Sequence, residues 1–357
     1  GPKVLWTVSL GEGYGGAAIV DGKVYVLDRV VNEQDILRCF DLDSGKEEWT
    51  FAYDAPGRFS HPGSRTVPAV DDERIYTCGS MGDFYCIDKE THKPIWNKHI
   101  LMDFSGNEPP GWGIVQNPLL YEGMVIVAPM TSEAGVVAFD QVTGEVRWTS
   151  PALPGRPSYT SPSIVTIDGV DQVVMISAGD GGRSRGRRGR GRGGDDGDQS
   201  ANKGAIVALN PKTGEQLWSY DSWQCRIPIP NVVAVGDGRF LITGGYEAGS
   251  AMFRVEKRGD SYEVEELYKT IEYGTHVHPP VLYEDHFYVH YSTNERRDGM
   301  VCMNMDGEIK WKTGTSPLFD KGGMLLADGL IFTVDGNEGY LYLIEPSPDE
   351  FKVRSKT

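Results

Sequence analysis

The sequence predicts an all-β protein whose sheets stand side by side around a ring, a seven-bladed β-propeller of four-stranded antiparallel blades. Three observations predict it. The 357 residues include 45 Gly and 21 Pro, as in a chain with many turns. A motif that ends in Trp recurs along the chain, and hairpin patterns fill the stretches between its copies. Because one such unit cannot bury both faces of its sheet alone, we expect the units to stack on one another.

Each copy of the motif has a small residue, a large apolar residue, Asp or Asn, a turn, and then Trp. The clear copies are 39–49 (CFDLDSGKEEW), 86–96 (CIDKETHKPIW), 138–148 (AFDQVTGEVRW), 208–218 (ALNPKTGEQLW) and 302–311 (CMNMDGEIKW). They end at Trp49, Trp96, Trp148, Trp218 and Trp311, and degenerate copies end near Tyr268 and span 340–351. Asp or Asn bonds its own backbone and Gly supplies a left-handed turn, so a strand, a turn and a second strand are expected. The tryptophans are predicted to pack between blades.

A further hairpin precedes each copy, with Asp-Gly, Glu-Gly or Gly-Asp-Gly at most bends. The resulting units are 12–54, 60–100, 112–150, 157–221, 226–271, 275–314 and 316–357, all within one domain, 1–357. Residues 1–10 read as an N-terminal closing strand that carries Trp6. We expect this strand to pair with the last blade, and eight blades are the alternative.

The composition excludes several classes of protein. The net charge of −16 argues against nucleic acid as a partner, and 39% hydrophobic residues argue against disorder. No run approaches the roughly 18 apolar residues of a transmembrane helix. Three of the five cysteines, Cys39, Cys86 and Cys302, occupy one position of the motif, where other copies have Ala138 and Ala208. These cysteines are therefore predicted to be small buried core residues.

The Asp-x-x-Thr-Gly-x-x-x-Trp core of the motif resembles the pyrroloquinoline-quinone (PQQ) propeller repeat. Over essentially its whole length the chain is similar to bacterial PQQ-binding-like β-propeller repeat proteins, which are related to the BamB lipoprotein and to quinoprotein alcohol dehydrogenases. The opening GPKVLW, the GYGG at 13–16 and the LIEPSPDEFKV at 343–353 resemble secreted members from Planctomycetes-type bacteria. The resemblance implies a periplasmic or secreted protein, although the chain shows no signal peptide.

For the dehydrogenases, the resemblance implies a disulfide between adjacent cysteines, a calcium ion held by Glu, Asn and Asp, and a catalytic Asp. This chain has no Cys-Cys pair and is much shorter than those enzymes. We therefore assign no catalytic residue and predict no cofactor, and PQQ and calcium are implied by the resemblance alone.

The segments that enter the innermost strands converge on one mouth of a propeller's channel. They contribute a polar, aromatic and locally basic set: Tyr14, His61, Arg65, Trp112, Gln116, Asn117, Tyr159, Arg226, His276, His278 and Lys321. Such a set suits an anionic or polyol ligand or a polar peptide.

Each candidate also has a structural interpretation. His276 and His278 resemble a metal pair, but no third ligand is placed by spacing, so a hydrogen-bonded rim is predicted and no metal. Arg65 and Arg226 could pair with acidic neighbours, and Trp112 could anchor its loop.

Residues 181–199 (GGRSRGRRGRGRGGDDGDQ) form an Arg/Gly-rich insert in the fourth unit. Its arginines are Arg183, Arg185, Arg187, Arg188, Arg190 and Arg192. The insert is either a solvated loop or a contact for an acidic partner, including another copy of the chain, and its aspartates disfavour RNA.

Together these features predict a non-catalytic, extracytoplasmic propeller that binds a protein or polymer and could assemble with itself. The alternative is a PQQ-dependent alcohol or polyol oxidoreductase.

Overall fold

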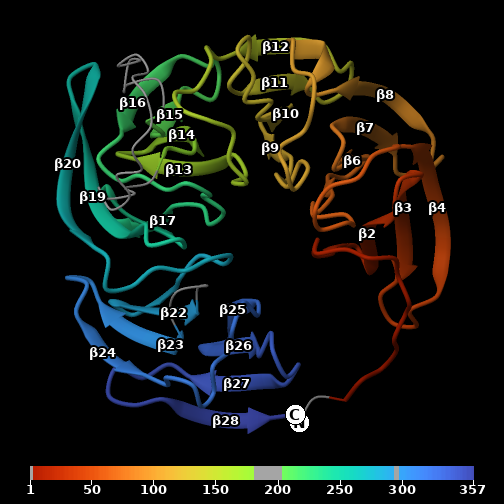
Figure 1. Ribbon diagram of the computed structural model, residues 1–357. Coiled ribbons are helices and arrows are strands. Elements are labelled where there is room, and N and C mark those ends of the chain that lie inside the picture. The colour runs from red at the N-terminus through yellow and green to blue at the C-terminus, as the bar shows by residue number, and fades with distance from the viewer. Residues whose placement is uncertain (1–2, 181–202, 293–296) are drawn as a thin grey trace, which may run out of the picture.

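The structure, a computed structural model, describes residues 3–180, 203–292 and 297–357. Its strands form seven antiparallel four-stranded sheets, each built from four strands that are consecutive along the chain. We call these sheets blades 1 to 7. The seven-bladed, all-β architecture predicted from the sequence is confirmed. Figure 1 shows the blades around a ring, with the fourth strand of each blade on the outside.

The strands of blades 1 to 4 are β1 (Ala18–Val20), β2 (Lys23–Val30), β3 (Gln34–Asp41), β4 (Glu47–Asp54), β5 (Ala69–Val70), β6 (Arg74–Cys78), β7 (Asp83–Asp88), β8 (Pro94–His99), β9 (Leu119–Tyr121), β10 (Met124–Val127), β11 (Val137–Asp140), β12 (Val146–Thr149), β13 (Ser163–Ile167), β14 (Val170–Ile176), β15 (Ile206–Leu209) and β16 (Gln216–Tyr220). A short 3-10 helix, η1 (Met102–Phe104), links blades 2 and 3.

The strands of blades 5 to 7 are β17 (Val233–Gly236), β18 (Arg239–Gly244), β19 (Gly249–Arg258), β20 (Ser261–Thr270), β21 (Val281–Tyr283), β22 (His286–Ser292), β23 (Arg297–Asn304), β24 (Ile309–Lys312), β25 (Met324–Ala327), β26 (Leu330–Val334), β27 (Leu341–Glu345) and β28 (Lys352–Lys356). Within the described residues, none of the helices has the length and apolar character needed to traverse a bilayer.

The motif turn forms as the residue types require. In blade 3, Asp140 Oδ1 accepts hydrogen bonds from the backbone N–H groups of Val142 (2.9 Å) and Thr143 (2.7 Å). Gly144 then adopts φ +70°, the left-handed conformation that glycine takes without strain. This turn connects the third strand of the blade to the fourth.

One row of side chains crosses each blade, and we call it the tryptophan row. In blade 3 the row is Leu119, Ile126, Ala138 and Trp148, which lie opposite one another in register on the four strands. It packs against blade 4 in one core cluster. Through this row of side chains, one blade packs against the next.

In blades 1 to 6 the second and third members of the row are at most 2% exposed. These pairs are Tyr25 and Cys39, Tyr76 and Cys86, Ile126 and Ala138, Val174 and Ala208, Leu241 and Met252, and Tyr288 and Cys302. The prediction that the three motif cysteines are buried core residues is confirmed.

The outer member of the row reaches the motif turn of the next blade. Trp96 Nε1 donates to Gln141 O (3.1 Å), and Trp148 Nε1 donates to Pro211 O (2.9 Å). Trp311 Nε1 donates to a backbone oxygen of blade 7 in the same way. The tryptophans therefore pack between blades, as predicted.

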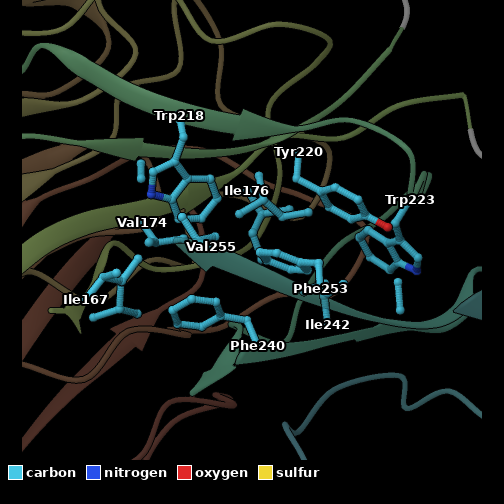
Figure 2. Close-up of a cluster of buried hydrophobic side chains, with 14 of the residues drawn as sticks. Ile167, Val174, Ile176, Trp218, Tyr220, Trp223, Phe240, Ile242, Phe253 and Val255 are labelled. Atoms are coloured by element: carbon cyan, nitrogen blue, oxygen red, sulfur yellow. The ribbon is translucent and has the colours of Figure 1, made fainter. Parts of the chain in front are cut away.

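Six core clusters join successive blades, from blades 1 and 2 through blades 6 and 7. Figure 2 shows the one between blades 4 and 5, where Trp218 and Tyr220 face Phe240 and Phe253. Most of the apolar core thus lies between blades.

The predicted closing strand is wrong in one respect, because residues 3–10 form no strand and β28 pairs with β27. The segment, red in Figure 1, runs between β28 and β4. Its Trp6 Nε1 donates to Leu42 O (2.8 Å) in the turn of blade 1. The alternating sequence makes a strand favourable, but residues 3–10 form no ladder with a strand of the described residues, and a strand needs such a ladder to bond its backbone. The Arg/Gly-rich insert lies outside the described residues.

Candidate functional site at the channel mouth

The segments that lead from the outer strand of one blade to the inner strand of the next are tied to one another by side chains. We call them lead-in segments. Val67 N donates to Asn117 Oδ1 (2.8 Å), and Asn117 N donates to Ser161 Oγ (2.9 Å). Ser161 N in turn donates to Asn231 Oδ1 (3.2 Å). These bonds hold the lead-in segments of blades 2 to 5 in fixed relative positions.

The side chain of Gln116 is used by the fold, which corrects its predicted part in ligand contact. Gln116 is buried, and its amide both donates to Ala128 O (2.6 Å) and accepts from Ala128 N. Asn117 uses its carbonyl oxygen on blade 2. A buried amide without partners is costly, so the Gln116 side chain satisfies backbone groups, and the half-buried Asn117 engages one backbone N–H through its oxygen.

Tyr14 and Arg65 come together because the lead-in segments of blades 1 and 2 pair locally. Gly13 forms a parallel bridge with Ser64, and Tyr14 N donates to Ser64 O (2.7 Å). Gly63 has φ +107°, and a Cβ there would overlap the carbonyl oxygen of Glu12. The glycine is therefore required for this close approach.

Arg65 lies among aromatic rings. Its guanidinium carbon is 4.6 Å from the centroid of the Tyr14 ring and 5.9 Å from that of Phe59. Its Nη2 donates to the backbone oxygen of His61. Burial lowers the pKa of Arg65 below its usual value, but a guanidinium stays protonated.

Among the described residues, no carboxylate forms an ion pair with Arg65, and its buried Nε has no hydrogen-bond partner. A half-buried cation without a counter-charge attracts anionic groups. The predicted alternative, pairing with an acidic neighbour, is not seen in this part of the chain.

Two further lead-in segments extend the aromatic surface. The ring of Trp112 lies 4.9 Å from that of Tyr159 and 6.1 Å from that of His61. Burial raises the pKa of Tyr159, and the nearby charge of Arg65 opposes this rise. The structure thus brings six residues together, which we call the mouth cluster: Tyr14, Phe59, His61, Arg65, Trp112 and Tyr159.

A buried ion pair missed by the sequence analysis lies beside this cluster. Arg29 Nη1 is 2.6 Å from Asp35 Oδ1, and both side chains are buried. Burial raises the pKa of Asp35 to about 6, because desolvation outweighs the attraction of Arg29. The guanidinium carbon of Arg29 lies 5.3 Å from the centroid of Phe59, so the pair also braces that ring. The repeats gave no signal for it, because Arg29 and Asp35 lie outside the recurring motif.

The other predicted residues lie in separate places. The guanidinium carbon of Arg226 is 5.1 Å from the ring centroid of Tyr246, which meets His276 edge-on at 4.7 Å. Beside them is a pocket of about 550 Å³, lined by Ser222, Trp223, Gln224, Tyr246, Glu247, Ala248, Lys269, Thr270 and Ile271.

His278 and Lys321 belong to the lead-in segments of blades 6 and 7. Burial lowers the pKa of His278, and a hydrogen bond with the backbone of Lys321 opposes this. Residues 3–180, 203–292 and 297–357 contain no group of three or more His, Cys, Asp or Glu arranged to hold a metal ion.

The cysteines show whether the residues suit a quinone centre of the implied kind. All five are buried free thiols, and burial raises the pKa of Cys39 to about 11 and that of Cys225 to about 12. A redox disulfide needs two sulfurs in contact at the site. The described residues therefore do not fit a centre built on adjacent cysteines and an acidic calcium site.

Comparisons with known proteins agree on the fold. The "Alcohol dehydrogenase (quinone), dehydrogenase subunit" of Komagataeibacter europaeus is 23% identical over 269 residues, covering 62% of this chain and 35% of that protein. The quinohemoprotein alcohol dehydrogenase of Comamonas testosteroni is 23% identical over 274 residues, covering 65% and 37%. The chain thus spans little more than a third of these curated relatives.

Solved structures match over nearly the whole chain. A europium-containing methanol dehydrogenase has a TM-score of 0.68 at 14% identity, covering 99% of this chain and 80% of that one. A quinohemoprotein alcohol dehydrogenase from Pseudomonas putida has a TM-score of 0.58 at 15% identity, covering 98% and 67%. The family model described as "Outer membrane protein assembly factor BamB" matches residues 32–221, more than half of the chain. With its seven blades and tryptophan rows, the chain belongs to this family of PQQ-type propeller proteins.

Proposed function

We propose that this protein is an extracytoplasmic, non-catalytic binding propeller whose mouth cluster holds an anionic group of a protein or polymer. One observation carries the proposal: Arg65 stands half-buried among aromatic rings, with no carboxylate partner in the described residues. Aromatic faces hold a guanidinium in one orientation, so its outer edge is prepared for a carboxylate.

Binding of defined polymers tests this function. We expect poly-L-glutamate and polygalacturonate to bind saturably in isothermal titration calorimetry and neutral dextran not to bind. Affinity should fall with salt, because the attraction is electrostatic. Arg65→Gln should weaken binding by about tenfold or more, as removal of a charged partner does.

The matched control is Arg226→Gln, which removes another aromatic-stacked arginine in a different lead-in segment. If both variants bind like the unaltered protein, or if only Arg226→Gln loses binding, the mouth cluster is not the site.

The Arg/Gly-rich insert adds a proposal about partners. We infer from its six arginines that it contacts an acidic surface, including that of a second copy, since the rest of the chain is strongly acidic. Self-association measured by ultracentrifugation should then weaken with salt and disappear on deletion of 181–199. Association that persists through both changes would contradict this.

Quinone-dependent alcohol oxidation is the second candidate, favoured by the names of the curated relatives. It is tested by adding PQQ and calcium and measuring dye-linked oxidation of alcohols beside a binding titration. Saturable quinone binding with turnover would replace the binding proposal.

A further inference from the structure

The buried ion pair beside the mouth cluster is fixed to the segment that carries one of its rings. Arg29 on β2 and Asp35 on β3 lie opposite one another in register, with Arg29 Nη1 2.6 Å from Asp35 Oδ1. Arg29 Nη2 donates to Ala55 O (2.8 Å) and to Gly57 O (3.2 Å), just before Phe59 in the sequence. The pair therefore holds the backbone that presents Phe59 to the mouth.

The ring of Phe59 also connects the pair to Arg65. The guanidinium carbon of Arg29 is 5.3 Å from the centroid of this ring, and that of Arg65 is 5.9 Å from the same centroid. The two cations are thus on the order of 10 Å apart, close enough for their charges to act on one ligand. Asp35 neutralises Arg29, whereas no carboxylate of the described residues pairs with Arg65.

The negative charge of Asp35 has little support besides Arg29. Its Oδ2 is buried, and no hydrogen bond from a described residue reaches it. Gly79 closes the space beside this oxygen, since a Cβ there would overlap it and would lie 2.8 Å from the Tyr53 hydroxyl. Burial raises the pKa of Asp35 to about 6, so the carboxylate takes up a proton in mildly acidic solution.

Titratable groups also face Asp35 from three other strands. Burial raises the pKa of Tyr53 on β4 and of Cys78 on β6, so both stay uncharged at neutral pH. Asp83 on β7 is a carboxyl whose pKa is likewise raised by burial, with the nearby His99 opposing the rise. Asp83 and His99 are therefore the neighbours whose protonation has to be told apart from that of Asp35.

We propose that Arg29 and Asp35 are positioning residues of the mouth cluster and that protonation of Asp35 strengthens the binding of an anionic group at Arg65. This inference rests on the proposed binding function and names its regulation. When Asp35 takes up a proton, the charge of Arg29 is no longer neutralised, and a second cation attracts the ligand. At this separation, in a partly buried site, we expect full protonation to tighten binding about fivefold.

The binding experiment uses dextran sulfate, whose sulfate esters keep their charge in mild acid. His61 is replaced by Gln throughout, because an imidazole of the mouth cluster would itself gain charge there. In the His61→Gln protein, the dissociation constant should fall about fourfold from pH 7.5 to pH 5 at constant ionic strength. With Asp35→Asn added, binding at pH 7.5 should already be as tight and should no longer depend on pH.

The matched control is Asp140→Asn, which removes the same charge from another buried carboxylate paired with an arginine, Arg147. Asn210 and Asn304 occupy the same position of the motif in other blades, so asparagine is compatible with this turn. The turn lies at the end of its antiparallel blade opposite to the lead-in segment. This variant should therefore keep the full dependence on pH.

Proton uptake on binding gives a second measurement that needs no change at Asp35. Whatever protonation does to anion affinity, a bound anion does to proton affinity by the same factor. Calorimetric titrations near pH 6, in buffers of different ionisation enthalpy, should show uptake of about 0.4 proton per anionic group bound at Arg65.

The outcomes separate this inference from the proposed function. Binding without proton uptake, or binding that weakens in acid, would overturn the inference and leave the function standing. A dependence on pH that persists in Asp35→Asn would overturn it in favour of Asp83 or His99. Dextran sulfate that binds at no pH would overturn both.

Discussion

His290 shows how burial at one residue sets a dependence on pH. It is buried, with Nδ1 3.0 Å from Gly322 O and Nε2 2.8 Å from Thr333 Oγ1. Burial, and secondarily the nearby His278, lower its pKa to about 4. The unfolded chain, with a pKa near 6.5, therefore binds more protons than the folded chain between these values. The contribution of His290 to stability is complete above pH 6.5 and is lost as the pH falls toward 4.

We expect His290→Gln to remove this dependence. Between pH 7 and pH 4 the unaltered protein should lose about 3 kcal/mol more of its free energy of unfolding than the variant does. Urea denaturation at both pH values measures the difference. Parallel losses in the two proteins would show that His290 is not the titrating group.

The sequence predicted which residues belong to the mouth cluster better than it predicted what each side chain contacts. Tyr14, Arg65 and Trp112 follow from their places just before inner strands. Phe59 was missed, because the sequence does not indicate which side chain an apolar loop residue will contact. Gln116 was misjudged, because sequence position does not say whether an amide turns toward a backbone or toward solvent.

The contact between a tryptophan and the next motif turn can be tested at the scale of one element. Gly214 has φ +73°, and a Cβ there would lie 2.5 Å from the ring of Trp148. Gly169, with φ +75°, has no atom within 4 Å of the same position. The two glycines thus differ mainly in the tryptophan.

Gly169→Ala should lower the free energy of unfolding by about 1 kcal/mol, the price of a left-handed alanine. Gly214→Ala should add a further ~1–3 kcal/mol of overpacking. Chemical denaturation of the two variants checks this. If the two variants lose the same free energy of unfolding, the turn at Gly214 shifts to accept the Cβ without disturbing Trp148.

Strands were predicted correctly where the strand that pairs with them is adjacent in the sequence. Each hairpin contains both strands that bond one another, so the alternation and the turn residues sufficed for all seven blades. Residues 3–10 have the same alternation but belong to no hairpin, and they form no strand. Alternation shows which face a strand would bury and not whether an adjoining edge exists.

For the molecule as a whole, the cysteines separate the two candidate functions. All five are buried free thiols, and burial raises the pKa of Cys86 to about 12. A thiol reagent should therefore label none in the native protein and five after denaturation, because the thiolate is the reactive form. Mass spectrometry counts the labels. Three labels after denaturation would reveal a disulfide and favour the quinone-dependent alternative.

The six core clusters between successive blades determine the order in which the blades should open. Each blade gains stability from the neighbours with which it shares a core, so the described blades behave as a line of coupled units from blade 1 to blade 7. Among the described residues, blades 2 to 6 share a core cluster with a neighbour on both sides, whereas blades 1 and 7 share one on a single side. Opening should begin at these ends and spread inward, and exchange rates should form a gradient that is slowest near blade 4. The ring would then unfold blade by blade from blades 1 and 7.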